Sequence, residues 1–254
     1  MNIDDILVGR MGENDSPKNS FVGYMQNFFF DKYRFFDYFL YGGQPADIRF
    51  GGTVNITIVE KLLPIHSVSI RDNPNAFLIL QTLQIIGDTT IRLMFKTKER
   101  DGLILYNGGL AGDFFAMELV NGILHVSAND GSGARVVTAS APSLSNNEWH
   151  LVEIIQTEAK RFDIIVDQNY VSTMLLPETR NTLDLTDRLY VGGIPESLRP
   201  RIPSIVASKK GFVGCLASFT VNGRLYNLLN DATSSSVYVT PGCTGRCRVN
   251  FYFS

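Results

Sequence analysis

The chain has 254 residues, 44% hydrophobic and 19% charged, and this composition excludes a disordered, collagen-like or coiled-coil protein. Its 23 basic and 25 acidic residues leave a formal net charge of -2, so no basic excess indicates a nucleic-acid partner. The sequence contains no run of about 18 apolar residues, the length that a membrane-spanning helix needs. Residues 1–6 are acidic, whereas a signal peptide begins with basic residues.

An aromatic segment occupies residues 21–41, where 11 of the side chains are Phe or Tyr. Such a segment needs a surface to pack on, because exposed aromatic clusters promote aggregation. The turn-forming residues 42–45, Gly-Gly-Gln-Pro, follow it and indicate a boundary.

The rest of the chain has the pattern of short β-strands. Residues 89–97 alternate Ile91, Leu93 and Phe95 with polar side chains, as in a half-buried strand. Asn121-Gly122 joins two apolar runs, 114–120 and 123–126, and this pair favours the positive φ angles of a tight hairpin. Further strands are expected at 103–106, 149–155, 162–166, 189–191, 219–221 and 224–226. This spacing predicts an antiparallel sandwich or barrel.

An internal repeat divides the chain. Residues 6–10 and 21–28 match residues 189–193 and 212–219, where the second copy closes a complete β domain. We therefore expect residues 1–43 to be the C-terminal remnant of an upstream domain. Residues 44–62 would form a linker and first-strand region, 63–243 a complete domain, and 244–254 a truncated tail.

Signatures of catalysis are missing from the sequence. His66, His125 and His150 lack the spacing of a zinc protease motif, and neither a nucleophile elbow nor a phosphate-binding loop occurs. The alternating carboxylates of a sandwich glycosidase are also absent. The sequence favours a non-catalytic binding module over an enzyme.

Residues 89–243 resemble the laminin G-like (LNS) domain, an antiparallel jelly-roll β-sandwich. The resemblance rests on several strings taken together: Asp101-Gly102-Leu103-Ile104-Leu105, residues 112–119, Asn147-Glu148-Trp149-His150, residues 189–196, and Gly211-Phe212-Val213-Gly214-Cys215. Within the family, the strings 113–119 and 183–196 are most similar to the third LNS domain of the α-neurexins, and residues 1–43 would then belong to the second.

The neurexin resemblance implies the extracellular part of a single-pass synaptic membrane protein that acts in Ca²⁺-dependent cell adhesion. Its partners would be extracellular proteins of the neuroligin kind, and an EGF-like repeat would begin near residue 244. The alternative is a laminin-like matrix module that binds acidic glycans through Arg199, Arg201, Lys209 and Lys210, although the charge pattern by itself favours a solvated loop.

The family pattern also implies a disulfide bond between Cys215 and Cys243, which would leave Cys247 unpaired. In a cytosolic protein the same two residues would instead be buried thiols. Asn55-Ile56-Thr57 forms an N-glycosylation sequon, which is compatible with secretion.

A Ca²⁺ site at the rim of the sandwich is implied in the same way. The matching positions supply the side chains of Asp113 and Asp184 and the backbone carbonyls of Asp130 and Thr182. Carboxylate and carbonyl oxygens suit Ca²⁺, but four protein ligands are fewer than the six to eight that the ion takes, so affinity should be weak. Without the resemblance, both aspartates could be ordinary turn residues.

Overall fold

The computed structural model describes residues 64–243, except 86, 159–160, 178–182 and 209, and the two short strands β1 (Phe29–Phe30) and β2 (Tyr33–Arg34), which pair antiparallel. The chain divides into two compact units at residues 62 and 63, and the second contains the sandwich. Asn55, Cys247, Thr182 and Lys209 lie outside the described residues. The proposed remnant, linker and EGF-like start remain predictions.

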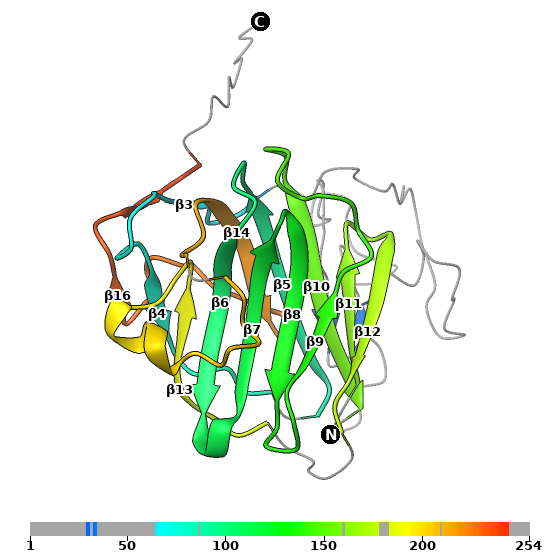
Figure 1. The fold of residues 1–254 in the computed structure, drawn as a ribbon. Helices are drawn as coiled ribbons and strands as arrows, with labels where there is room; N and C mark the ends of the chain where they lie inside the picture. The colour runs from blue at the N-terminus through cyan, green and yellow to red at the C-terminus, as the bar shows by residue number, and fades with distance from the viewer. Residues whose placement is uncertain are drawn as a thin grey trace, which may run out of the picture. The chain divides into compact units, whose positions relative to one another are not determined.

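Two antiparallel sheets form a β-sandwich, which confirms the predicted all-β fold (Figure 1). The eight-stranded sheet has the order β12-β11-β10-β5-β14-β3-β17, and β15 pairs with β14. Its strands are β3 (Val68–Ile70), β5 (Thr89–Lys96), β10 (His150–Glu158), β11 (Arg161–Val166), β12 (Tyr170–Leu175), β14 (Gly214–Val221), β15 (Arg224–Leu225) and β17 (Val239–Pro241).

The seven-stranded sheet has the order β16-β4-β13-β6-β7-β8-β9. Its strands are β4 (Leu78–Leu80), β6 (Gly102–Gly109), β7 (Phe114–Val120), β8 (Ile123–Asn129), β9 (Arg135–Thr138), β13 (Leu185–Val191) and β16 (Ser234–Ser235). Two 3-10 helices, η2 (Leu110–Gly112) and η3 (Glu196–Arg201), follow β6 and β13. In the described part of the chain, no helix is sufficiently long and apolar to cross a bilayer.

The main core lies between the two sheets. The alternating residues Ile91, Leu93 and Phe95 of β5 face it, as the sequence pattern predicts. Phe115 from β7 and Phe162 from β11 meet there from opposite sheets, with ring centroids 6.5 Å apart. Each fully buried aromatic side chain contributes about 1.5–3 kcal/mol of transfer free energy, so this layer is the main source of stability.

A second, smaller core lies on the outer face of the seven-stranded sheet. Leu103, Phe114 and Ala116 on that face pack with Ile194 and Val206. Val206 belongs to residues 202–208 and 210–212, here called the strap, which follow η3 and cross in front of β6 in Figure 1. The strap therefore covers a sheet face that would otherwise expose apolar side chains.

Glu118, in the middle of β7, holds the strap in place. Its side chain is fully buried, and its two carboxylate oxygens accept hydrogen bonds from the backbone N–H groups of Ala207 (2.9 Å) and Ser208 (2.5 Å). Further along the strap, the carbonyl of Leu103 accepts a hydrogen bond from the backbone N–H of Phe212. The N–H of Leu103 donates to the carbonyl of Lys210. A buried carboxylate needs such donors to replace water, so Glu118 and the strap stabilise each other.

Candidate functional site: the rim at the end of strands β6 and β8

Three aspartates lie at the end of the sandwich where β6 and β8 end. Asp113 lies between η2 and β7, and Asp130 follows β8. Phe114 and Asn129 are register partners in the β7–β8 hairpin, so the two aspartates extend from neighbouring strand ends. Asp184 directly precedes β13, which pairs with β6. These turns, here called the rim, surround η2 at the lower end of the sandwich in Figure 1.

Contact between Asp113 and Asp184 is direct. The backbone N–H of Asp184 donates to Oδ2 of Asp113 at 2.9 Å, across 71 residues of sequence. The backbone of Leu110 in turn donates to the carbonyl of Asp184 at 3.2 Å. Gly109 allows this approach, because a Cβ at that position would collide with the carbonyl oxygen of Asp184. The structure thus brings together two of the predicted Ca²⁺ ligands.

The environments of the three aspartates differ. The Asp113 and Asp130 residues are each only 2% exposed, whereas Asp184 is exposed. Oδ1 of Asp130 accepts hydrogen bonds from the backbone N–H (3.0 Å) and the hydroxyl of Ser132. The side chain of Asp130 therefore stabilises its own turn, which is compatible with the prediction that only its carbonyl is a ligand.

The groups available at the rim suit a hard cation. They are carboxylate and carbonyl oxygens, with no nitrogen or sulfur among the predicted ligands. In the described residues, no three His, Cys, Asp or Glu side chains converge as a ready metal cluster. Thr182 is not among the described residues. The donor set therefore fits Ca²⁺ in chemical type, and the Ca²⁺ site remains a prediction.

A tyrosine pair lies beside the rim on the outer face of the seven-stranded sheet. Tyr106 of β6 and Tyr190 of β13 are register partners. Tyr106 stacks on Phe114 with ring centroids 6.4 Å apart, and Tyr190 meets Phe77 edge-on at 6.2 Å. Burial, and then the nearby carboxylate of Asp187, raise the pKa of both phenols above the ordinary value near 10.

We expect these raised pKa values to weaken the fold at alkaline pH. A phenol with a higher pKa in the folded state contributes stability that is complete below about pH 10 and is lost as the pH rises through its folded pKa. The free energy of unfolding should therefore decrease above about pH 10, and Tyr106→Phe should reduce this decrease. Urea unfolding at several alkaline pH values measures the effect. An identical pH slope in Tyr106→Phe would contradict the assignment to Tyr106.

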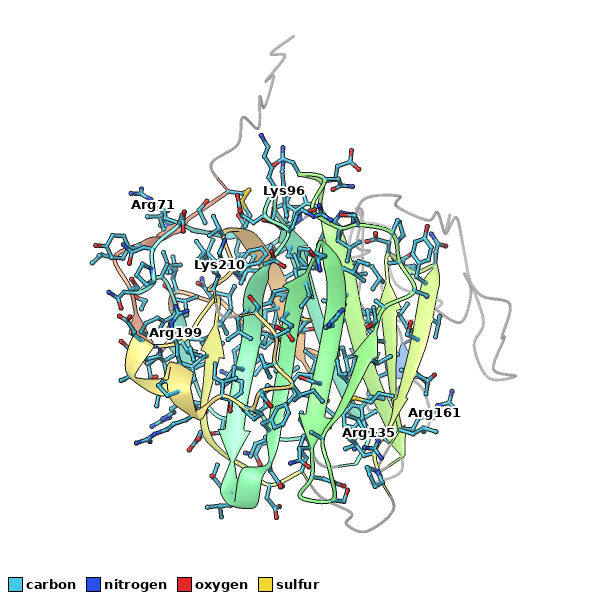
Figure 2. All side chains as sticks on the ribbon, viewed as in Figure 1. Arg71, Lys96, Arg135, Arg161, Arg199 and Lys210 are labelled. Atoms are coloured by element: carbon cyan, nitrogen blue, oxygen red, sulfur yellow. A yellow bond between two sulfur atoms is a disulfide. The ribbon has the colours of Figure 1, made fainter. Side chains whose placement is uncertain are left out.

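The residues of the predicted glycan site are only partly brought together. Arg199 and Arg201 lie in η3, so the expected loop is in part a short helix. Arg199 and Lys210, both labelled in Figure 2, line one small hollow, but Arg199 is half-buried and donates to the carbonyl of Pro74 at 3.4 Å. At least one guanidinium donor therefore serves the fold rather than a ligand.

The cysteines at the opposite end of the sandwich are joined. Cys215 of β14 and Cys243 form a disulfide bond with their Cα atoms 5.5 Å apart, in the pairing that the resemblance implies. Lys96 and Arg71, labelled in Figure 2, lie toward the same end, far from η2.

The structure gives a role to two further residues, Glu118 and Asp187. For Glu118, the signal in the sequence is an acidic residue within the apolar run Phe114–Val120, because a buried carboxylate requires partners. For Asp187, the signal is a charged residue at the alternate position that Leu185, Leu189 and Val191 would otherwise make apolar, which indicates an irregular strand.

Together these features describe a two-layer antiparallel sandwich with an oxygen-rich rim at one end and a disulfide bond at the other. A Laminin G domain family model matches residues 95–224, more than half of the chain, and the chain therefore belongs to the laminin G domain family.

Curated relatives and solved structures agree with this assignment. The chain is 34% identical to neurexin-3a of Danio rerio over 226 residues, which cover 89% of the chain and 13% of that protein. It is 36% identical to neurexin-2 of Homo sapiens over 172 residues, which cover 67% of the chain and 10% of that protein. The chain thus spans only about a tenth of the length of these relatives.

Solved laminin domains have the same fold. The LG4-5 domains of the mouse laminin alpha1 chain match with a TM-score of 0.60 and 22% identity, over 78% of this chain and 52% of that one. The LG1-3 region of the laminin alpha2 chain matches with a TM-score of 0.59 and 24% identity, over 72% of this chain and 36% of that one. At these identities the match indicates the fold alone.

Proposed function

We propose that the chain is a non-catalytic recognition module of a cell-surface protein, similar to the neurexins, which binds an extracellular protein partner through the rim. The observation that carries the proposal is the direct contact of Asp113 with Asp184, two residues that are remote in sequence and adjacent at one end of the sandwich. Loops at the edge of a rigid sandwich are suited to recognition, because they can vary without disturbing the core.

In this proposal a Ca²⁺ ion orders the rim. The carboxylates of Asp113 and Asp184 and the carbonyls of Asp130 and Thr182 would hold it, and water or a partner would complete its shell. With so few protein ligands, the dissociation constant should lie in the extracellular range of roughly 10⁻⁴–10⁻³ M. The role of the chain's own residues is to neutralise and position the ion, and thereby to fix the loops that face a partner.

Calorimetric titration of the full chain with CaCl₂ tests the site. We expect Asp113→Asn, which keeps the size of the side chain and removes its charge, to weaken Ca²⁺ binding by at least about tenfold. Asp72→Asn is the matched control, because Asp72 is exposed and follows β3 at the other end of the sandwich. Equal binding by wild type and Asp113→Asn would disprove the assignment.

A further inference from the structure

Strand β13 bulges next to the rim, where its register against β6 shifts. Leu185 pairs with Gly109, and Leu189 pairs with Asn107. The two pairs are therefore four residues apart along β13 but only two residues apart along β6. The residues between the two leucines are therefore pushed out of the regular ladder. Bulges of this kind redirect side chains and occur frequently next to functional sites.

The bulge is held rigidly at Asp187. The carbonyl oxygen of Asp187 accepts hydrogen bonds from Nδ2 of Asn107 at 2.9 Å and from the hydroxyl of Thr82 at 2.7 Å. Asn107 is fully buried, and its Oδ1 accepts from the backbone N–H of Leu83 at 2.8 Å. The backbone of Asp187 is thus fixed to the body of the sheet, and its exposed side chain projects from a rigid support.

Asp187 lies close to a glycine and acts on two neighbouring tyrosines. A Cβ built on Gly108 would lie 2.7 Å from Oδ2 of Asp187 and 3.5 Å from the hydroxyl of Tyr106. The same carboxylate acts electrostatically on Tyr190, the register partner of Tyr106. Gly108, Tyr106, Tyr190 and Asp187 therefore form one small surface, here called the tyrosine niche. It adjoins the rim, because Gly109 contacts Asp184.

The Asp187 carboxylate has no hydrogen bond or ion pair with any other residue in the part of the chain that the structure describes. After burial, which is the larger cause, the negative charge of Asp187 also raises the pKa of the two phenols. Aromatic faces attract cations, and a carboxylate forms its strongest hydrogen bonds with cationic donors. A rigid carboxylate flanked by aromatic rings thus has the chemistry to recognise a cationic side chain.

We propose that the tyrosine niche receives an arginine or lysine side chain of the protein partner. The inference rests on the proposed function, because it places the partner at the same end of the sandwich. Charge complementarity favours this occupant, because the exposed carboxylate of Asp187 is not among the proposed Ca²⁺ ligands and keeps its negative charge for a partner. Since the support is already rigid, little conformational entropy is lost when the cation binds.

Nuclear magnetic resonance titration of the ¹⁵N-labelled full chain with N-acetyl-arginine methylamide tests the niche. We expect shifts of the Gly108, Gly109 and Tyr190 amides, and a reduction of at least about fivefold in these shifts with Asp187→Asn. The neutral N-acetyl-citrulline methylamide, which has nearly the same shape, should shift them little. Tyr106→Phe keeps the ring and should retain binding within about twofold, whereas Tyr190→Leu should weaken it.

Two further variants separate this inference from the proposed Ca²⁺ site. Asp72→Asn should bind the arginine probe as wild type does, and Asp113→Asn should lose Ca²⁺ but keep the arginine shifts. If Asp113→Asn binds the probe normally and wild type fails to bind Ca²⁺, the Ca²⁺ proposal fails and the niche stands. The proposal for the niche would be overturned if the citrulline probe gave shifts equal to those of the arginine probe. It would also be overturned if a folded Asp187→Asn variant showed undiminished shifts with the arginine probe.

Discussion

Glu118→Ala is expected to lower the free energy of unfolding by about 3–5 kcal/mol. It removes two hydrogen bonds to a charged acceptor and leaves one buried and one part-buried N–H group without partners. The affected groups are the backbone amides of Ala207 and Ser208 in the strap. Urea unfolding gives the energy. Hydrogen exchange of the two amides, which should become faster, reports whether the strap has been released.

Glu118→Gln distinguishes charge from packing. The amide fills the same volume, but its NH₂ group would face one of the strap N–H groups, so a smaller loss of about 1–3 kcal/mol is expected. Glu148→Ala, at an exposed carboxylate before β10, serves as the matched control and should change stability by less than about 0.5 kcal/mol. Unchanged exchange at Ala207 and Ser208 in Glu118→Ala would show that Glu118 does not hold the strap.

The double substitution Cys215→Ala, Cys243→Ser should cost about 3–4 kcal/mol. The bond closes a loop between residues 28 apart, and its removal returns the conformational entropy of that loop to the unfolded chain. Comparison of urea unfolding for the oxidised chain and the double variant measures the cost. The change at residue 215 is kept small because Cys215 is buried in β14.

A reducing agent provides the second test of the bond. It should destabilise the wild-type chain by a similar amount and leave the double variant unaffected, and peptide mapping of the oxidised chain should recover Cys215 joined to Cys243. A wild-type chain whose stability is the same with and without the reducing agent would contradict the assigned role of the disulfide.

Much of the fold could be predicted because it follows from local pattern. The alternation around Leu93 and the Asn121-Gly122 turn depend on neighbours in sequence, and the structure has β5 and the β7–β8 hairpin at those places. Strands such as β3, β4 and β17 were not predicted. They have only three residues each, too few for a recognisable period.

The site was less accessible from sequence. Asp113 and Asp184 were selected through the family resemblance, because their proximity depends on β6 lying between β7 and β13 in the sheet. The exposure of the Asp187 side chain depends on a register shift in β13. The role of Glu118 depends on its contact with the strap, which lies about 90 residues further along the chain. The sequence indicates either a glycan-binding or a solvated side chain for Arg199. Its hydrogen bond to the carbonyl of Pro74 could not be predicted, since it joins segments 125 residues apart.

The disulfide bond also determines how the sandwich would carry mechanical load. Gly214, Cys215 and Leu216 of β14 pair with Ile70, Ser69 and Val68 of β3. Tension applied to the two sides of the domain would enter at β3 and leave through the sulfur bridge to β14, the adjacent strand. β15, β16 and β17, between the two cysteines, would be bypassed. The rim, at the opposite end, would lie off the line of force and keep its shape while the molecule is pulled.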